Sequence, residues 1–271
     1  MATPLWFVNL IKIFFPQKTN IAKLTRIPII RELVDYILFH NDGVVYLTRD
    51  TVIPIHEAIE PAENILLPSQ VVTHFIEKAN YHWIMNECLC RDANDCKSYA
   101  HDLGCIFLGE TAAKINPAIG RHVTKAEALQ HAQKCRDAGL VHMIGRNKLD
   151  TFWMGVNPGN KLMTICNCCS CCCLYSILPD LHQTISKKIT RMPGVFIHVT
   201  DTCIGCGLCT QQVCFVNAIQ LVDDKAEISD DCRGCGKCIE ICPNGAIEIT
   251  ILEDAYIENV IQKIGPLVDL S

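Results

Sequence analysis

Two cysteine runs near the C-terminus constrain this chain more than any other feature. Each run is C-x2-C-x2-C followed by a fourth cysteine, and the second run begins about 30 residues after the first. Each iron of a cubane cluster takes one thiolate, so four thiolates hold one 4Fe–4S cluster. The eight cysteines therefore predict two clusters, with the fourth cysteine of each run crossing to the cluster of the other run. The predicted iron ligands are Cys203, Cys206, Cys209 and Cys242 for one cluster and Cys232, Cys235, Cys238 and Cys214 for the second.

The two runs and their flanks resemble the bacterial-type two-cluster ferredoxins over residues 191–251. AIQLVDDKAEISDDC predicts a strand, a turn at Asp223 and Asp224, and a second strand, and GAIEIT predicts another strand. The chain departs from the family where Cys214 follows Cys209 as C-x4-C-Phe, since C-x3-C-Pro is usual there. We expect the additional residue to bulge the loop and Cys214 to remain a ligand. Two zinc sites are the alternative, but zinc sites use two separated cysteine pairs.

A second group of cysteines lies upstream, in CLCRDANDCKSYAHDLGCIFLG. Its four cysteines fall within 18 residues, with a spacing that matches no common zinc module. We predict that they help to hold a further iron–sulfur cluster; the alternative is buried or free thiols without metal. These residues are Cys88, Cys90, Cys96 and Cys105.

A third group is denser, because ICNCCSCCC places six cysteines in eight residues. Crowded thiolates repel one another, and thiols without metal at this density would oxidise readily. The segment therefore predicts a soft, iron-rich centre. One cubane using four of the six, two clusters sharing ligands with the preceding loop, and one larger non-cubane cluster all agree with the pattern. These residues are Cys166, Cys168, Cys169, Cys171, Cys172 and Cys173.

Between these two groups, VTKAEALQHAQKCRDAGLVH predicts a helix. Thr124 and Glu127 match a capping box at its start, and Gly139 follows its end. A hairpin over LVHMI and TFWMGV would complete a winged-helix-like unit. The helix has no clear basic face, so we expect no nucleic-acid binding. We expect Cys135 to be a core residue and His142 to be a hydrogen-bonded structural residue rather than a metal ligand.

The remaining pattern predicts an α+β fold: a cysteine-rich mixed α/β domain with a winged-helix-like part, followed by a bacterial-type ferredoxin domain. GVVYLTRDTVIPI predicts a strand pair, PSQVVTHFIEKAN a helix, and HWIMNECLC a buried strand that leads into the first cysteine loop. The predicted divisions are an anchoring or docking segment (1–31), the cysteine-rich iron–sulfur domain (32–190), the ferredoxin domain (191–252) and a C-terminal tail (253–271).

Composition bears on the location of the protein. A chain of 271 residues with 49% hydrophobic residues is long enough for about two domains. Its 19 cysteines have the spacing of metal ligands rather than disulfides, and we find no convincing export signal. The apolar stretch PLWFVNLIKIFF is too short to cross a bilayer. We therefore expect a cytoplasmic protein from a reducing, anaerobic cell.

Charge is unevenly distributed along the chain, whose net charge is −5. Residues 196–252 hold eight acidic and three basic residues, whereas residues 1–31 hold five basic and no acidic ones. The acidic segment could steer the protein toward basic partners, or it could only maintain solubility. The aromatic N-terminus predicts a short helix that stops at Pro16. That helix, within residues 1–16, could lie in a membrane interface, dock on a partner subunit, or pack on its own protein.

The order of these motifs over residues 28–251 resembles a family of anaerobe 4Fe–4S dicluster-domain proteins with an N-terminal CxCR and CNCCxCCC cysteine-rich domain. The resemblance implies a cytoplasmic iron–sulfur protein that passes electrons among partner proteins, without a settled reaction. It leaves the donor, the acceptor and any substrate open.

Three functions compete on this pattern. The favoured one is a multi-cluster electron carrier, or electron-input subunit of an oxidoreductase complex, relaying single electrons from a low-potential donor to a reductase. The second is a reductase subunit whose CNCCSCCC-bound cluster itself reduces a substrate, with Asn167, Ser170, His142 and Arg91 as a nearby polar set. The third is a nucleic-acid-binding sensor, which the acidic net charge opposes. The glycine-containing loops are ligand loops and not phosphate loops, so nicotinamide and flavin are not expected.

Overall fold

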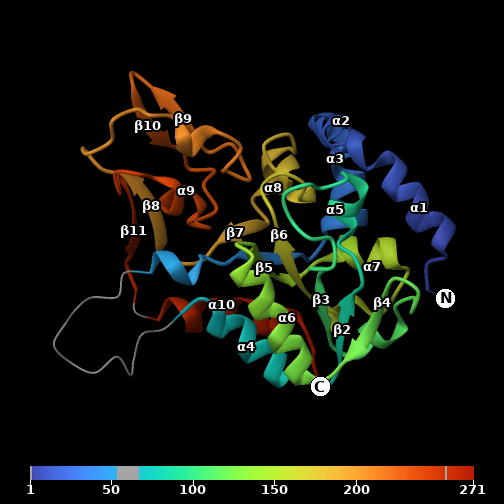
Figure 1. Ribbon diagram of the computed structural model, residues 1–271. Coiled ribbons are helices and arrows are strands. Elements are labelled where there is room, and N and C mark those ends of the chain that lie inside the picture. Colours follow the sequence, from blue (N-terminus) through green and yellow to red (C-terminus); the bar gives the residue numbers. More distant parts are fainter. Residues whose placement is uncertain (1, 54–66, 254) are drawn as a thin grey trace, which may run out of the picture.

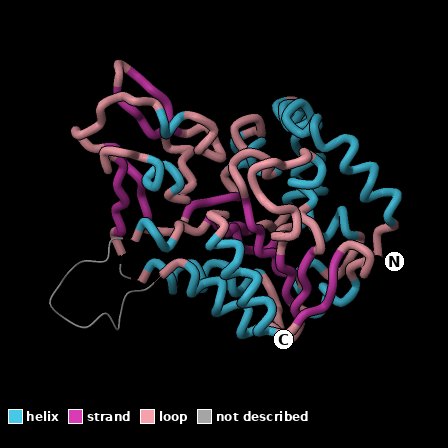
Figure 2. The backbone as a smooth tube through the Cα atoms, viewed as in Figure 1, coloured by secondary structure: helices cyan, strands magenta, loops and turns pink. Residues whose placement is uncertain are grey.

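The computed structural model describes residues 2–53, 67–253 and 255–271. A seven-stranded mixed sheet with helices on both faces forms the larger part, and a smaller unit with four strands stands at one end of it (Figure 1). Figure 2 shows that loops make up much of this smaller unit. The predicted combination of a mixed α/β region and a ferredoxin-like region is confirmed at this level.

The large sheet has the strand order β4-β2-β3-β6-β5-β1-β7. Neighbouring strands are antiparallel except β1 and β7, which are parallel. The strands are β1 (Gly43–Tyr46), β2 (His82–Met85), β3 (Ile106–Leu108), β4 (Gly120–Val123), β5 (Val141–Arg146), β6 (Met163–Cys168) and β7 (Ile189–Arg191).

Successive side chains on these strands point to opposite faces of the sheet, and both faces are covered. One face packs against three helices that lie together in Figure 1: α4 (Ser69–Lys78), α6 (Lys125–Asp137) and α10 (Tyr256–Ile264). On β6, Met163 and Ile165 belong to this core. Cys166 and Cys168 alternate with them and pack on the opposite side. The strand period therefore sends the cysteines of β6 to one face.

The opposite face is covered by short helices from several parts of the chain. Near the N-terminus, Val8 and Ala22 are buried against residues of the sheet and its loops. The other helices of this larger part are α1 (Leu5–Phe14), α2 (Lys18–Lys23), α3 (Pro28–Val34), α5 (Leu89–Ala93), α7 (Lys148–Met154) and α8 (Gln183–Ser186).

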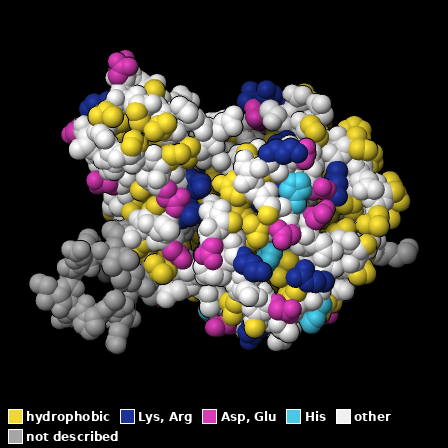
Figure 3. Space-filling view, in the orientation of Figure 1, with side chains coloured by type: hydrophobic (Ala, Val, Ile, Leu, Met, Phe, Trp, Pro, Cys, Tyr) yellow, Lys and Arg dark blue, Asp and Glu magenta, His cyan; other side chains and the backbone are white. Residues whose placement is uncertain are grey.

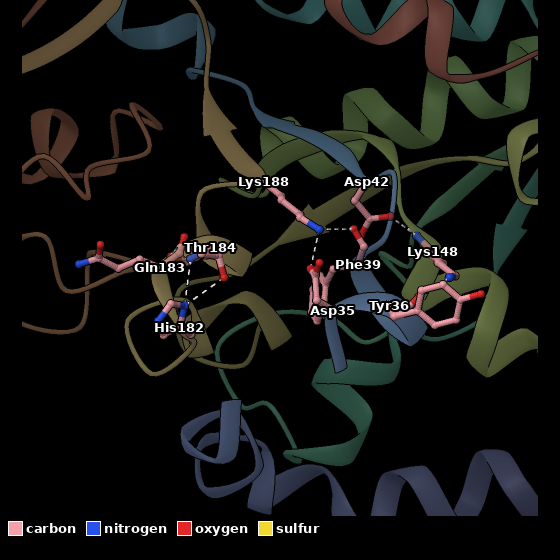
Figure 4. Close-up of polar contacts among 10 residues, drawn as sticks. Asp35, Tyr36, Phe39, Asp42, Lys148, His182, Gln183, Thr184 and Lys188 are labelled. Atoms are coloured by element: carbon pink, nitrogen blue, oxygen red, sulfur yellow. Dashed lines mark hydrogen bonds and ion pairs between the residues drawn. The ribbon is translucent and has the colours of Figure 1, made fainter. Parts of the chain in front are cut away.

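A polar network joins the N-terminal helices to the sheet region (Figure 4). The ammonium of Lys188, just before β7, pairs with the carboxylate of Asp35 and donates a hydrogen bond to the carbonyl of Phe39 at 3.1 Å. Asp42 accepts a hydrogen bond from the backbone N–H of Lys148 at 2.7 Å, at the start of α7. These contacts hold the π-helical turn at 35–39 against the remainder of the protein.

The smaller unit contains two antiparallel strand pairs and one helix. The strands are β8 (Val195–Val199), β9 (Ile219–Val222), β10 (Lys225–Ile228) and β11 (Ile247–Ile251), and the helix is α9 (Lys237–Ile241). The predicted strand, turn and strand are confirmed as β9 and β10. Asp223 and Asp224 form the turn with φ of +46° and +60°, the left-handed values that a two-residue hairpin turn of this type requires.

Several local predictions upstream are also confirmed. PSQVVTHFIEKAN forms α4, and β2 is a fully buried strand. Thr124 and Glu127 make a capping box at the start of α6, and Gly139 follows its end with φ of +80°. Cys135 is fully buried on α6, as expected for a core residue.

The predicted hairpin after α6 is wrong. Its first half is β5, but its second half forms the helix α7, and β5 pairs with β6 instead. Asp150 explains the helix: its carboxylate accepts hydrogen bonds from the Asn147 amide at 2.8 Å and the Trp153 indole at 2.9 Å. The winged-helix-like part of the prediction is therefore wrong as well, since a helix stands where its second strand was expected.

The predicted strand pair over GVVYLTRDTVIPI is also wrong in the part that the structure describes. Only β1 forms there, with β5 and β7 as its partners, and residues 50–52 form a 3-10 turn. The chain leaves the sheet because the backbone N–H of Arg49 bonds to the carbonyl of Cys235 at 3.1 Å, in the smaller unit. Residues 54 and 55 of this stretch lie outside the described residues.

The segment predicted as a C-terminal tail, 253–271, contains the helix α10. This helix packs into the main core through Tyr256, Ile257, Val260 and Ile264. The end of the chain therefore contributes to the hydrophobic core beneath the large sheet.

We predict that Ile264→Ala lowers the free energy of unfolding by about 2–5 kcal/mol, because it removes a fully buried side chain. Chemical denaturation under anaerobic conditions measures the change. Gln262→Ala, on the exposed side of the same helix, is the matched control and should have little effect. Equal stability of the two variants would contradict this role for α10.

Candidate metal centres

The smaller unit brings the eight cysteines of the two runs around two separate small cavities. Each cavity has a volume of about 20 Å³ and is bordered by three cysteines of one run and the last cysteine of the other. The first is lined by Cys203, Cys206, Cys209 and Cys242, and the second by Cys232, Cys235, Cys238 and Cys214. Two groups of four thiols around compact spaces suit two 4Fe–4S clusters.

Backbone N–H groups point at several of these sulfur atoms. Ala226 donates to Cys203 Sγ at 3.4 Å, and Ala246 donates to Cys242 Sγ at 3.2 Å. In the other set, Ala218 donates to Cys214 Sγ at 3.3 Å. Hydrogen bonds to the ligand sulfur atoms tune the potential of a bound cluster.

The ligand loop at Gly205 requires a residue without a side chain. Gly205 has φ of +69°, and a Cβ built on it would lie 2.1 Å from the carbonyl oxygen of Asp224. A larger residue would therefore separate the first ligand loop from the turn between β9 and β10.

The additional residue of the first run is accommodated locally. Gln212 takes a left-handed conformation with φ of +58°, and Cys214 still borders the second cavity. The chain thus absorbs the longer C-x4-C spacing without moving Cys214 away from the other three cysteines of that set.

Ten further cysteines gather where the two upstream loops meet. Four of them form a compact group in which all sulfur atoms lie within 4.8 Å of one another, and the Sγ atoms of Cys96 and Cys171 are 3.7 Å apart. We name these residues the compact set: Cys96, Cys169, Cys171 and Cys172. Four thiols so close together could hold a metal ion or a cluster.

The other six upstream cysteines border a large apolar cavity of about 460 Å³, which Cys169 of the compact set also touches. Cys168 and Cys173 have their sulfur atoms 3.2 Å apart. The cavity lies between these cysteines and the N-terminal helices, since Phe15 and Lys18 also line it. We name these residues the six-cysteine set: Cys88, Cys90, Cys105, Cys166, Cys168 and Cys173.

The buried side chain of Arg91 connects the two upstream loops. It is fully buried and donates hydrogen bonds to the carbonyls of Asn167, at 3.0 Å, and Leu103. The thiols of Cys88 and Cys169 lie in its electrostatic field. A buried guanidinium is therefore available to offset the charge of this group of thiolates.

The cysteine pairs perturb one another's acidity. The hydrogen bond from Cys90, supported by the Arg91 charge, lowers the pKa of Cys88 to about 6. The same hydrogen bond, together with burial, raises the pKa of Cys90. Burial raises the pKa of Cys135, which lies beside the compact set, to about 12.

The predicted polar set is divided by the structure. Arg91 and Asn167 border the large cavity, and Ser170 lies in the turn between Cys169 and Cys171. His142 lines a different cavity, of about 270 Å³. Burial lowers the pKa of His142 to about 3, so its ring is neutral near pH 7. It alternates with Val141 and Met143 on β5 and so faces away from the six-cysteine set.

Two aromatic residues to which the sequence analysis assigned no role lie between the upstream and downstream cysteines. Tyr46 on β1 is fully buried, and its ring lies obliquely against Phe215 at 5.7 Å between centroids. Both belong to a core that also contains Cys168, and Cys235 packs against it.

The hydroxyl of Tyr46 is unusual, because it has no hydrogen-bond partner in the described part of the chain. Burial raises the pKa of Tyr46, and the neighbouring thiols of Cys173 and Cys168 raise it further. A buried tyrosine usually has a partner for its hydroxyl. The strand pattern of this segment does not reveal that the Tyr46 ring lies near sulfur atoms.

Comparison with known proteins supports the downstream site. Residues 196–243 match the family model described as "4Fe-4S dicluster domain". No curated protein and no solved structure matches the chain. The segment is therefore a 4Fe–4S dicluster domain, which implies two clusters and an iron–sulfur electron-transfer role.

We predict that Arg91→Met lowers the metal content of the upstream cysteines, because it leaves several buried thiolates without a nearby positive charge. Arg91→Lys retains the charge and should retain more of the metal. Iron and sulfide analysis of anaerobically purified protein measures the loss, and the spectra of the dicluster domain serve as a folding control. Unchanged metal content in Arg91→Met would contradict this role of the guanidinium.

Proposed function

We propose that this protein is a multi-cluster iron–sulfur electron-transfer protein that relays single electrons between a low-potential donor and a partner reductase. The observation that supports it best is the arrangement of the dicluster domain, where two sets of four cysteines border two neighbouring cavities. When bound, a 4Fe–4S cluster accepts and releases one electron at a time. The protein would then be a subunit or partner of a larger reductase complex in the cytoplasm of an anaerobe.

The ligands follow from the two cavities and the upstream loops. Cys203, Cys206, Cys209 and Cys242 would hold one cluster, and Cys232, Cys235, Cys238 and Cys214 a second. One or two additional iron–sulfur clusters would use cysteines of the two upstream loops. The hydrogen bonds to Cys203, Cys214 and Cys242 are the contribution of the backbone to holding these thiolates.

The set that contains Cys206 is the suitable place for electron exchange with a partner. Cys206 is exposed, and its neighbour Ile204 has 65% of its surface exposed. The eight acidic residues of 196–252 would steer this surface toward a basic partner.

The set that contains Cys235 lies next to Tyr46 and Phe215. These two rings fill space between the dicluster domain and the upstream cysteines, which keeps water out of that region. An electron leaving this set would therefore cross packed side chains on its way to an upstream centre.

A reductase subunit is the second candidate, and the large cavity favours it. Its volume of about 460 Å³ is within the range of ligand pockets, and its walls are mostly apolar with Arg91 and Asn167 among the polar groups. A substrate could meet a centre bound to the six-cysteine set there. The discriminating observation would be an iron atom in this cavity that lacks a protein thiolate.

The relay can be tested with Cys214→Ser. We predict that wild-type protein, reduced anaerobically, shows two magnetically interacting clusters by electron paramagnetic resonance. The variant should perturb the cluster of Cys232, Cys235 and Cys238 and retain that of Cys203, because Cys214 borders only the former cavity. Reoxidation by a one-electron acceptor should then be slower for the upstream centres.

Two results of this experiment would count against the assignment. Perturbation of the cluster bound by Cys203 instead would overturn the ligand sets. Clusters that fail to cycle between redox states in the wild-type protein would overturn the proposed function.

The N-terminal helices present an apolar face to solvent as well as the face that covers the large cavity. Trp6 is 67% exposed and Ile13 is 71% exposed, whereas Val8 of the same helix is buried. Figure 3 shows apolar side chains gathered on the surface at the right of the view, where α1 lies in Figure 1. In the described part of the chain, none of the helices combines the length and apolar character needed to cross a bilayer. We propose that this face docks on a partner subunit or a membrane interface.

We predict that the double variant Trp6→Glu, Ile13→Glu weakens this docking without lowering the iron content, since neither side chain is buried. Leu252→Glu, with a 66% exposed leucine in another part of the chain, is the matched control. Liposome flotation and pull-down of native partners, at low and high salt, distinguish the two targets. Equal behaviour of the double variant and the control in both assays would refute docking through this face.

A further inference from the structure

The ten upstream cysteines are not one site. We propose that the compact set, Cys96, Cys169, Cys171 and Cys172, binds a single tetrahedral metal ion, and that the six-cysteine set holds a separate polynuclear iron–sulfur centre. This division rests on the proposed iron–sulfur function of the upstream region and specifies it further. It assigns a different chemistry to each set.

The spacing of the compact set is that of a mononuclear site. A tetrahedral ion with metal–sulfur bonds of about 2.3 Å places its sulfur ligands about 3.8 Å apart. The Sγ atoms of Cys96 and Cys171 are 3.7 Å apart, and all four sulfur atoms lie within 4.8 Å of one another. Three of the four side chains are buried. Four closely spaced and largely enclosed thiolates are typical of structural zinc sites and of single-iron tetrathiolate sites.

The dicluster domain provides an internal comparison. Each thiolate of a cubane binds a different iron, so the four sulfur ligands stand around the cluster instead of around one ion. Among the described residues, the compact set is the only group of three or more Cys, His, Asp or Glu side chains whose ligand atoms all lie within 4.8 Å of one another. The structure describes all eight cysteines of the dicluster domain, and in neither set of four do the sulfur atoms lie this close together. The sulfur atoms of the compact set are therefore too close together to stand around a cubane cluster.

The six-cysteine set is more extended. Its sulfur atoms form contacts in sequence, from Cys105 to Cys166, from Cys166 to Cys168, and from Cys168 to Cys173 at 3.2 Å. The other two members, Cys88 and Cys90, form a further pair at the start of α5. A row of four thiols and a separate pair cannot surround one ion at tetrahedral distances. The set has two thiols more than one cubane requires, which favours a larger centre with several irons.

The surroundings of the six-cysteine set suit such a centre. The cavity provides room, with a volume of about 460 Å³ against about 20 Å³ for each cavity of the dicluster domain. Arg91 supplies a buried positive charge. Lys18 on α2 also borders the cavity, and its ammonium donates to the carbonyls of Cys172 and Cys173 at 3.0 and 2.9 Å. Both cations offset the negative charge that six thiolates bring.

Neighbouring residues on one turn belong to different sets, which explains the density of CNCCSCCC. Cys168 is in the six-cysteine set and Cys169 in the compact set, and the same holds for Cys173 and Cys172. Cys169 touches the large cavity as well, so the two sites are neighbours that share this turn. An ion in the compact set would fix the conformation of the turn that supplies Cys168 and Cys173.

Metal and sulfide analysis of full-length, anaerobically purified variants tests the division. Cys171→Ser, at an exposed ligand of the compact set, should lose about one metal ion per chain and no inorganic sulfide, since a tetrathiolate ion carries none. Cys166→Ser should lose several iron and sulfide ions and retain the single ion. Cys135→Ala, beside the compact set, is the matched control and should lose neither.

Several outcomes would overturn the proposal. Loss of about four iron and four sulfide ions from Cys171→Ser would make the compact set a cubane. Loss of the same metal from Cys171→Ser and Cys166→Ser, or no loss from Cys171→Ser, would also exclude two separate sites. The electron paramagnetic resonance spectrum of the dicluster domain reports on folding in each variant. The two hypotheses fail on different results. Metal and sulfide analysis tests the division into two sites, whereas the proposed function fails only if the clusters do not exchange electrons.

Discussion

The contact on which the upstream half of this protein depends is the buried guanidinium of Arg91. It donates hydrogen bonds to carbonyls of both cysteine-rich loops, at Leu103 and Asn167, and it lies near the thiols of Cys88 and Cys169. A charge buried this deeply is stable only with compensating negative charge. In the proposed metal-bound state, thiolates of both loops would provide that charge, so the arginine and the cysteines would stabilise each other's burial. The packing of the two loops and the proposed binding of metal by their cysteines therefore depend on the same buried charge.

The large sheet determines where this chemistry is located. On β6, alternate residues go to opposite faces, so Met163 and Ile165 join the helical core while Cys166 and Cys168 face the large cavity. The helices α4, α6 and α10 complete the hydrophobic core on one side. The N-terminal helices lie on the other side and border the large cavity together with the six-cysteine set. An apolar core thus supports a cysteine-rich face, and that division follows from the two-residue period of the strands.

The dicluster domain is attached to this framework by polar and apolar contacts. Arg49 pairs with Glu240 of α9 at 2.5 Å, and Lys237 donates to the carbonyl of Gly139 at 3.2 Å. These contacts explain why the expected strand pair after β1 does not form, since the chain at Arg49 turns toward the dicluster domain. Likewise, the expected hairpin gives way to α7, because Asp150 accepts hydrogen bonds from Asn147 and Trp153 within a helix.

The features that could be predicted from the sequence are those that depend on nearby residues. The cysteine runs predicted the dicluster domain, Thr124 and Glu127 predicted the start of α6, and the strand pattern predicted the hairpin of β9 and β10. The grouping of the ten upstream cysteines could not be predicted in this way, because it depends on contacts between distant parts of the chain. Cys96 meets Cys171 across 75 residues of chain, and the adjacent Cys168 and Cys169 belong to different sets. Spacing along the chain identifies candidate ligands, but strand register and loop packing decide which sulfur atoms share a site.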